Sequence, residues 1–138
     1  MWKKLKASRN TIAALLAVLI LAAGCGPSKE IKLDASDNGS QVKLEKGQTL
    51  VVALESNPST GYRWKVIEFE SPILLQKGEA EFKSSDSREP PPPGTGGTET
   101  FRFEAISAGQ MTLELVYHRS WEEKVDPLET FSLQVVVR

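Results

Sequence analysis

The sequence predicts an all-β domain in which two antiparallel sheets pack face to face around a core. After residue 30, apolar and polar residues alternate with a period of two, as in strands that bury one face. Turn residues separate these runs at regular intervals, and no run carries the 3.6-residue apolar stripe of a helix. These observations indicate an immunoglobulin-like antiparallel β-sandwich of seven or eight strands. The single cysteine excludes the cysteine pair of antibody domains, so only the general architecture follows.

The first 24 residues have the architecture of a secretory signal peptide. A basic start precedes a 12-residue apolar run, residues 12–23, which is too short to span a bilayer as a helix. Cys25 lies where a bacterial lipobox places the cysteine that is lipidated after cleavage, although Ala22 stands at the usual leucine position. We expect a signal peptide over residues 1–24 and a lipidated tether over residues 25–30. The alternatives are a plain secreted protein with an incidental Cys25, or an uncleaved signal anchor.

The length, cysteine content and charge of the chain after the signal peptide limit which partners are possible. It is 114 residues long, enough for one domain with one core, which we place at residues 31–138. We expect it to be extracytoplasmic and membrane-anchored on a bacterial cell surface, and no second cysteine is present for a disulfide. It carries 13 Lys and Arg against 18 Asp and Glu, a formal charge of −5. Such an acidic domain argues against nucleic-acid binding, and we expect a monomer.

The period-two runs define the predicted strands in chain order. They cover residues 31–35, 41–44, 48–55, 63–68, a shorter strand within 74–82, and then 98–105, 110–118 and 128–137. Asn38-Gly39 lies between the first two runs and is typical of a hairpin turn. Trp64 falls on the inward face of its strand, so we expect it in the core.

One connection between strands has the chemistry of a loop with a fixed shape: Asn57-Pro58-Ser59-Thr60-Gly61-Tyr62. Pro58 fixes its own φ and pushes Asn57 into an extended conformation. The two hydroxyl residues can bond to nearby backbone, and Gly61 can adopt a positive φ. Such a loop holds one conformation at low entropic cost, which suits a binding surface. For these six residues alone, a simple connecting turn is an equally good interpretation.

Three unusual loops should share one end of the sandwich, because loops between alternating strands fall at alternate ends. The first is the loop just described. The second, residues 88–97, has four prolines followed by Gly94-Thr95-Gly96-Gly97, whose uncovered backbone suits main-chain pairing with a partner. The third, residues 118–122, carries Trp121 among polar neighbours. Tryptophan is enriched at binding hot spots, and the alternative is that this indole folds back over the sandwich end.

These loops resemble the motifs of a known inhibitor family. Asn57-Pro58-Ser59-Thr60-Gly61-Tyr62 resembles the Asn-Pro-Thr-Thr-Gly-Tyr motif of chagasin-like inhibitors of papain-like cysteine peptidases. Gly94-Thr95-Gly96-Gly97 is similar to the glycine-rich motif of that family, and Arg119-Ser120-Trp121 to its Arg-Pro-Trp motif. The resemblance runs from about residue 30 to the end, with motif order and spacing preserved. Ser120 stands where the family usually has proline, which predicts a less rigid loop.

The resemblance implies a reversible, wedge-type inhibitor that is not an enzyme and needs no cofactor. The loop at residues 57–62 would enter the peptidase cleft near the catalytic cysteine, with Thr60 making the closest approach. The loop at residues 94–97 would pair backbone to backbone on one side, and Trp121 with Arg119 would pack on the other. Such contacts fit an interface of about 800 Å² per partner.

The sequence gives little support for a catalytic, metal or phosphate site. His118 is the only histidine and has no nucleophile motif beside it, and the ligands of a zinc site are missing. The glycines at 94–97 lack the lysine of a phosphate loop, and we interpret Glu122, Glu123 and Asp126 as a solvated acidic loop rather than a calcium site. Two alternative functions remain. One is a cell-surface binding or adhesion module without inhibitory activity, and the other is an accessory domain of a secretion or envelope system.

Overall fold

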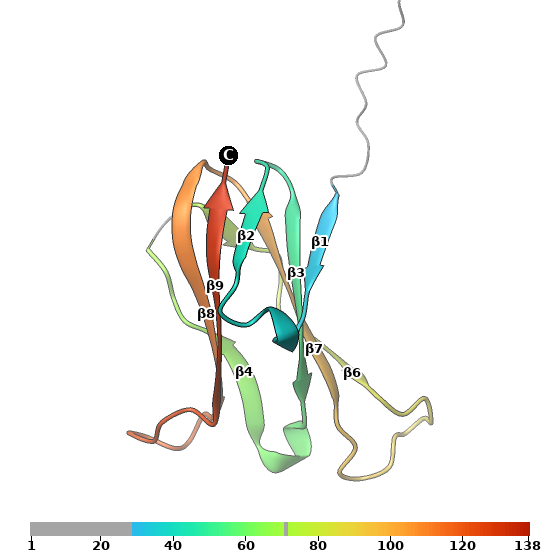
Figure 1. Ribbon diagram of the computed structural model, residues 1–138. Helices are drawn as coiled ribbons and strands as arrows, with labels where there is room; N and C mark the ends of the chain where they lie inside the picture. Colours follow the sequence, from blue (N-terminus) through green and yellow to red (C-terminus); the bar gives the residue numbers. More distant parts are fainter. Residues whose placement is uncertain (1–28, 71) are drawn as a thin grey trace, which may run out of the picture.

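The computed structural model describes residues 29–70 and 72–138, which form two facing β-sheets (Figure 1). The expected signal peptide and Cys25 lie outside the described residues. The first sheet contains β1 (Glu30–Leu33), β3 (Thr49–Ser56), β7 (Gly97–Ala105) and β5 (Leu74–Gln76), with β6 (Glu81–Ser84) also paired to β7. The second sheet contains β2 (Gln41–Leu44), β9 (Glu129–Val137), β8 (Gly109–Arg119) and β4 (Tyr62–Val66). Two 3-10 turns, η1 (Ala35–Asp37) and η2 (Pro58–Thr60), complete the described elements.

The predicted β-sandwich is confirmed, with nine strands among the described residues where seven or eight were expected. The additional strand arises because the run predicted at residues 74–82 is interrupted by Gly78, which has a φ of +73°. The two halves, β5 and β6, both pair antiparallel with β7, at opposite ends of that long strand. The remaining strands begin and end within about two residues of their predicted bounds.

The hairpin predicted at Asn38-Gly39 is wrong. β1 pairs in parallel with β3 and β2 pairs in parallel with β9, so the turn carries the chain from one sheet to the other. The Asn38 side chain is one physical reason, since its Nδ2 donates to Thr130 O (3.2 Å) and its Oδ1 accepts from Ser132 N (2.8 Å). The asparagine therefore bonds to the edge of β9, where a hairpin partner would otherwise lie.

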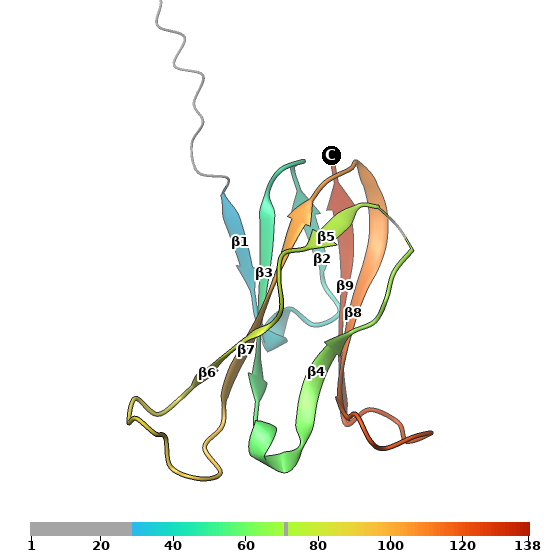
Figure 2. The same ribbon diagram turned by 180° about the vertical axis from the view of Figure 1, so that it is seen from behind.

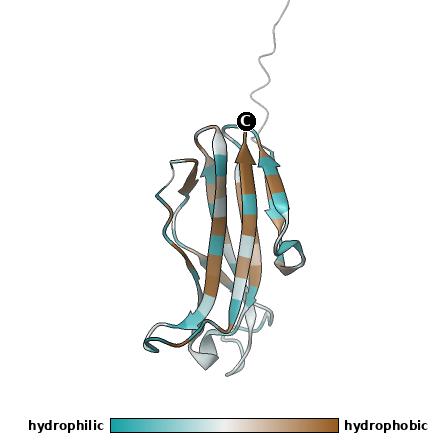
Figure 3. Ribbon diagram, turned by 60° about the vertical axis from the view of Figure 1, so that its left-hand side comes forward, coloured by the Kyte–Doolittle hydropathy of each residue, from teal (hydrophilic) through white to brown (hydrophobic). Residues whose placement is uncertain are grey.

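The inward faces of both sheets supply a single apolar core. Hydropathy alternates along the long strands, as the predicted period of two requires (Figure 3). The fully buried side chains include Leu50, Val52, Leu54, Phe103, Leu113, Leu115, Phe131, Leu133 and Val135. Trp64 is 8% exposed, which confirms its predicted place in the core. Its indole ring stacks on Tyr117 at 5.0 Å between centroids, and its Nε1 donates to Glu55 O (2.8 Å).

Within the described ranges, no helix has the length and apolar character needed to cross a membrane.

Candidate functional site

The three unusual loops lie together at one end of the sandwich, as the alternation of strand direction predicts. They are the β3–β4 loop (residues 57–61), the β6–β7 loop (residues 85–96) and the β8–β9 loop (residues 120–128). Figures 1 and 2 show the first loop between the other two, which extend to opposite sides. The start of β1 and the C-terminus lie at the other end. We call this group the loop end.

The β3–β4 loop is held in a single turn by its own side chains. Asn57 lies just before the 3-10 turn, and its Oδ1 accepts from Ser59 N (3.3 Å) and Ser59 Oγ (2.5 Å). Pro58 begins the turn, and Thr60 Oγ1 donates to Asn57 O (2.6 Å). Gly61 ends it with a φ of +83°, in the left-handed region that favours glycine. The exposed residues Ser59 and Thr60 therefore lie at the tip of a shaped loop.

Arg119 connects the β8–β9 side to the β3–β4 loop. Its Nε donates to Thr60 O (3.1 Å), and its Nη1 forms an ion pair with Glu122 Oε1 (3.0 Å). The guanidinium carbon lies 4.4 Å from the ring centroid of Tyr62 and 5.9 Å from that of Trp121. Each such cation–π contact contributes about 0.5–1 kcal/mol at an exposed site. Arg119 thus fixes the tip of one loop against the beginning of another.

Trp121 covers the glycine of the β3–β4 loop while leaving most of its surface to solvent. Its side chain is 65% exposed, so it does not fold back over the sandwich core. A Cβ placed on Gly61 would overlap atoms of the Trp121 six-membered ring. Gly61 is therefore required for two separate reasons, its positive φ and the indole that lies against it.

The glycine segment adjoins the β3–β4 loop from the other side. Asn57 Nδ2 donates to Gly94 O (3.2 Å), and Thr95 Oγ1 donates to Pro92 O (2.6 Å). Gly96 O accepts from both the backbone and the hydroxyl of Ser85, at 3.0 and 2.9 Å. The expectation that this backbone is uncovered therefore holds only in part, because the carbonyls of Gly94 and Gly96 are used within the domain.

Gly97 belongs to strand β7 rather than to the loop. It pairs with Ser56 of β3 on one side and with Ser84 of β6 on the other. A Cβ at Gly97 would overlap the backbone carbonyl oxygen of Lys83. This glycine allows β6 to approach β7 closely, which is a structural role within the predicted binding motif.

Residues 43–135 match the model of the chagasin family peptidase inhibitor I42. The chain belongs to the chagasin family. Chagasin from Trypanosoma cruzi is 30% identical over 105 residues, which cover 74% of this chain and 93% of chagasin. The family resemblance predicted from the three motifs is therefore confirmed, and this family consists of peptidase inhibitors rather than enzymes.

Solved structures of cysteine protease inhibitors share the fold. The crystal structure of EhICP2 from Entamoeba histolytica matches with a TM-score of 0.68 and 22% identity, covering 79% of this chain and 96% of that chain. The solved structure of ICP from Leishmania mexicana matches with a TM-score of 0.52 and 30% identity, covering 74% of this chain and 90% of that chain. The chagasin-like β-sandwich is thus found across relatives of low sequence identity.

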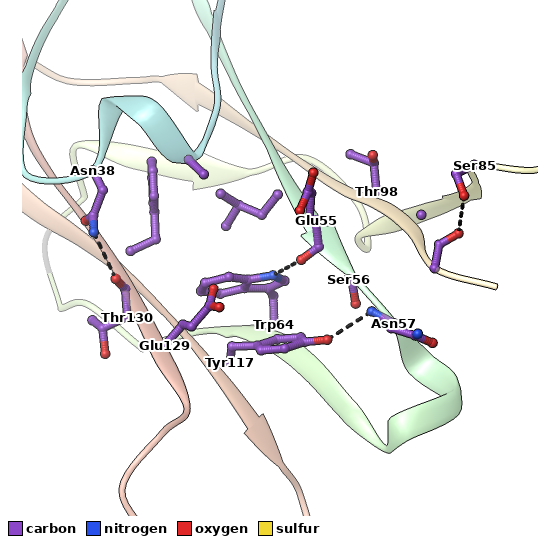
Figure 4. Close-up of a pocket in the computed structure, with 15 residues that line it drawn as sticks. Asn38, Glu55, Ser56, Asn57, Trp64, Ser85, Thr98, Tyr117, Glu129 and Thr130 are labelled. Carbon is purple, nitrogen blue, oxygen red and sulfur yellow. Dashed lines mark hydrogen bonds between the residues drawn. The ribbon is translucent and has the colours of Figure 1, made fainter. Parts of the chain in front are cut away.

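A cavity of about 930 Å³ lies beside the base of the β3–β4 loop, between the two sheets (Figure 4). Trp64 and Tyr117 line it together with Ser56, Asn57 and residues at the start of β9. The Tyr117 hydroxyl accepts from the backbone N–H of Asn57 (2.9 Å), so a core aromatic residue fixes the beginning of this chagasin-family loop. The sequence analysis did not find this contact, because Tyr117 lies 60 residues away along the chain.

Sequence reasoning also missed Glu99, a buried acidic residue at the base of the loop end. The signal was present in the pattern of β7. Phe101, Phe103 and Ala105 define the inward face, and the same period of two places Glu99 on it. Among the residues that the structure describes, no group of three His, Cys, Asp or Glu side chains could hold a metal ion.

Exposed ionic contacts occur in the flanking β6–β7 loop. The Arg88 guanidinium donates to both carboxylate oxygens of Asp86, from Nε to Oδ1 (3.0 Å) and from Nη2 to Oδ2 (2.6 Å). The hydrogen bonds from Arg88 lower the pKa of Asp86 below its ordinary value. These contacts shape the start of the β6–β7 loop, just before its four prolines.

Proposed function

We propose that this domain is a reversible, wedge-type inhibitor of papain-like cysteine peptidases that inserts its β3–β4 loop into the active-site cleft. The observation that carries the proposal is the assembly of all three family motifs at one end. Asn57 bonds to Gly94 O, Arg119 bonds to Thr60 O, and Trp121 lies against Gly61. Because these contacts exist in the free domain, little loop ordering would remain to be done on binding.

The conformation of the β3–β4 loop supports an inhibitor rather than a substrate. A peptidase cleaves an extended segment, whereas residues 58–60 form a 3-10 turn that ends in a left-handed Gly61. The Thr60 carbonyl already accepts a hydrogen bond from Arg119. The bond after Thr60 is therefore held outside the geometry required for cleavage, and the domain would bind without being consumed.

The flanking loops would provide the two sides of the wedge. Trp121 presents a large exposed aromatic surface beside the tip. Tryptophan is among the residues that contribute most of the binding free energy at protein interfaces. Ser120 replaces the proline usual in the family, but Glu122 N donates to Arg119 O (3.1 Å) and closes a turn around it. The Arg119–Glu122 ion pair reinforces that turn. We propose that these two contacts supply the rigidity that proline supplies elsewhere.

The N-terminal pattern supports a location for this inhibitor outside the cytoplasm. We propose that Cys25 is lipidated and anchors the domain to a membrane on a bacterial surface. A single acyl chain binds a membrane only marginally, so stable anchoring would need a multiply acylated cysteine. Because β1 begins at the end opposite the loops (Figure 1), such an anchor would leave the loop end directed away from the membrane.

The test is an inhibition assay with residues 26–138, which include every described strand and the whole core. Papain is incubated with increasing concentrations of the domain, and residual peptidase activity is measured before and after dilution. Stoichiometric loss of activity that recovers on dilution is the expected result. Full activity at a large excess of folded domain would instead favour the adhesion-module interpretation.

A further inference from the structure

A buried carboxylate lies directly beneath the loop end. The Glu99 side chain is 1% exposed and occupies the inward face of β7, the face that Phe101 and Phe103 use to build the core. Its register partner on β3 is the buried Leu54. Burying a charged group in such surroundings is costly unless it is paired and hydrogen-bonded. The buried Glu99 carboxylate therefore needs partners that bind its oxygen atoms.

Both partners of Glu99 flank the β3–β4 loop. Ser56 Oγ donates to Glu99 Oε1 (2.5 Å), and Arg63 Nε donates to the same oxygen (3.2 Å). Ser56 is the residue before Asn57, and Arg63 is the residue after Tyr62. One carboxylate oxygen thus connects the two ends of the six-residue motif. Glu99 also lies two residues after Gly97, on the strand that begins at the end of the glycine-rich loop.

We infer that Glu99 is a positioning residue for inhibition, which holds the base of the β3–β4 loop closed so that its tip enters a peptidase cleft in one conformation. This inference rests on the proposed function for its effect on inhibition. It differs from the contacts already described, because Tyr117 bonds to the start of the loop and Arg119 to its tip. Glu99 bonds to residues on both sides of the loop.

The alternative is that Glu99 only stabilises the fold. The ion pair between Glu99 and Arg63 should contribute little to the stability of the fold. The Arg63 side chain is 55% exposed, whereas the Glu99 carboxylate has lost its contact with water. Replacing both partners of a buried ion pair by apolar side chains is often neutral or stabilising, so such a pair is weak evidence for a role in stability. An apolar residue at 99 would extend the core beside Leu54, but it would leave the buried Ser56 hydroxyl without its acceptor. These two effects on stability oppose each other, so the substitution should change stability little while inhibition is lost.

The test compares Glu99→Met with Glu104→Met, both on residues 26–138. Glu104 is a matched control because it is also a β7 carboxylate in an ion pair, with Lys77 Nζ at 2.8 Å. It lies at the end of β7 remote from the loops, where it pairs with Thr49. For each variant we would measure the melting temperature, the inhibition constant for papain and the amide hydrogen exchange of residues 57–61.

We expect Glu99→Met to change the melting temperature little, to weaken inhibition by about tenfold or more through lost preorganisation, and to speed exchange at residues 57–61. Glu104→Met should leave the inhibition constant and the exchange unchanged. Glu99→Gln retains an acceptor for Ser56 but lacks the charge that attracts Arg63, so its inhibition constant should lie between those of the wild type and Glu99→Met. This isosteric variant also keeps the test decisive if the methionine variant fails to fold.

The possible failures are distinguishable. If the wild-type domain does not inhibit papain, the proposed function is wrong, and amide exchange alone still tests whether Glu99 holds the loop. If the wild type inhibits papain and both folded Glu99 variants inhibit it with the same inhibition constant as the wild type, the positioning role is wrong while the proposed function stands. Unchanged exchange at residues 57–61 in both variants would also overturn the inference.

Discussion

Gly61→Ala should separate backbone strain from the effect of displacing Trp121. Gly61 has a φ of +83°, and a Cβ there overlaps the indole ring. A left-handed alanine costs about 1–2 kcal/mol, and this strain is present in the free and the bound domain alike. It should therefore lower the free energy of unfolding, and the melting temperature by several degrees, without itself changing affinity.

The displaced indole should account for the loss of affinity. If Trp121 moves off Gly61, its stack with Arg119 is broken and the flanking contact with the peptidase is misplaced. We expect a loss of up to about 1–3 kcal/mol in binding free energy, the range for interface anchors. Thr60→Ala, which creates neither strain nor overlap, should lose less affinity than Gly61→Ala.

The assay is a double-mutant cycle that combines melting temperatures with inhibition constants for papain. In a Trp121→Ala background, Gly61→Ala should still cost stability but add little further loss of inhibition. Gly39→Ala is the matched control, because Gly39 has a φ of +80° and a Cβ there meets no atom within 4 Å. It should lose similar stability with no change in inhibition. A full loss of affinity from Gly61→Ala in the Trp121→Ala background would refute the reasoning.

Three further predictions follow from the same structure. Trp121→Ala should weaken papain binding by about 1–3 kcal/mol with little change in melting temperature, whereas Trp64→Ala should cost about 3–5 kcal/mol of stability; equal melting temperatures for the two variants would contradict this assignment. Cys25→Ala should move the protein from the membrane fraction to the medium or leave an unprocessed precursor, and cell fractionation with intact-mass measurement decides between these outcomes and no change. The wild-type domain should keep its intact mass during hours with excess papain, and rapid cleavage between Asn57 and Tyr62 would show that the loop is a substrate.

The strands and the two-sheet architecture could be predicted from the sequence because the relevant signals are local. Alternation along each run predicts the strands, and the alternating direction of successive strands predicts that three loops share one end. The same alternation assigned Trp64 to the core, and the polar neighbours of Trp121 favoured an exposed contact residue over an indole folded back over the sandwich end. Both assignments agree with the burial of these side chains, at 8% and 65% exposed.

The errors and omissions concern contacts between distant segments. The Asn38-Gly39 turn carries the signature of a hairpin, but the amide of Asn38 bonds to Thr130, 92 residues away. Tertiary contacts can override turn chemistry in this way, and no local pattern reports them. The Tyr117 hydroxyl on Asn57 and the lean of Trp121 onto Gly61 are likewise long-range contacts.

Glu99 is a different case, because its position on the inward face of β7 could have been read from the alternation. A charged residue at a core position breaks the local rule, and such violations are expected at functional or strained sites. What the sequence could not supply was the identity of its partners, Ser56 and Arg63, which lie 43 and 36 residues away.

The central claim is that the loop end occupies the active-site cleft of a papain-like peptidase. The most direct measurement is the binding of residues 26–138 to papain whose cleft is either empty or filled by a covalent, substrate-like inhibitor on the catalytic cysteine. Isothermal titration calorimetry on the two forms gives both affinities. The account predicts binding at a one-to-one ratio to the empty form and none to the filled form. Equal affinity for both forms would contradict it.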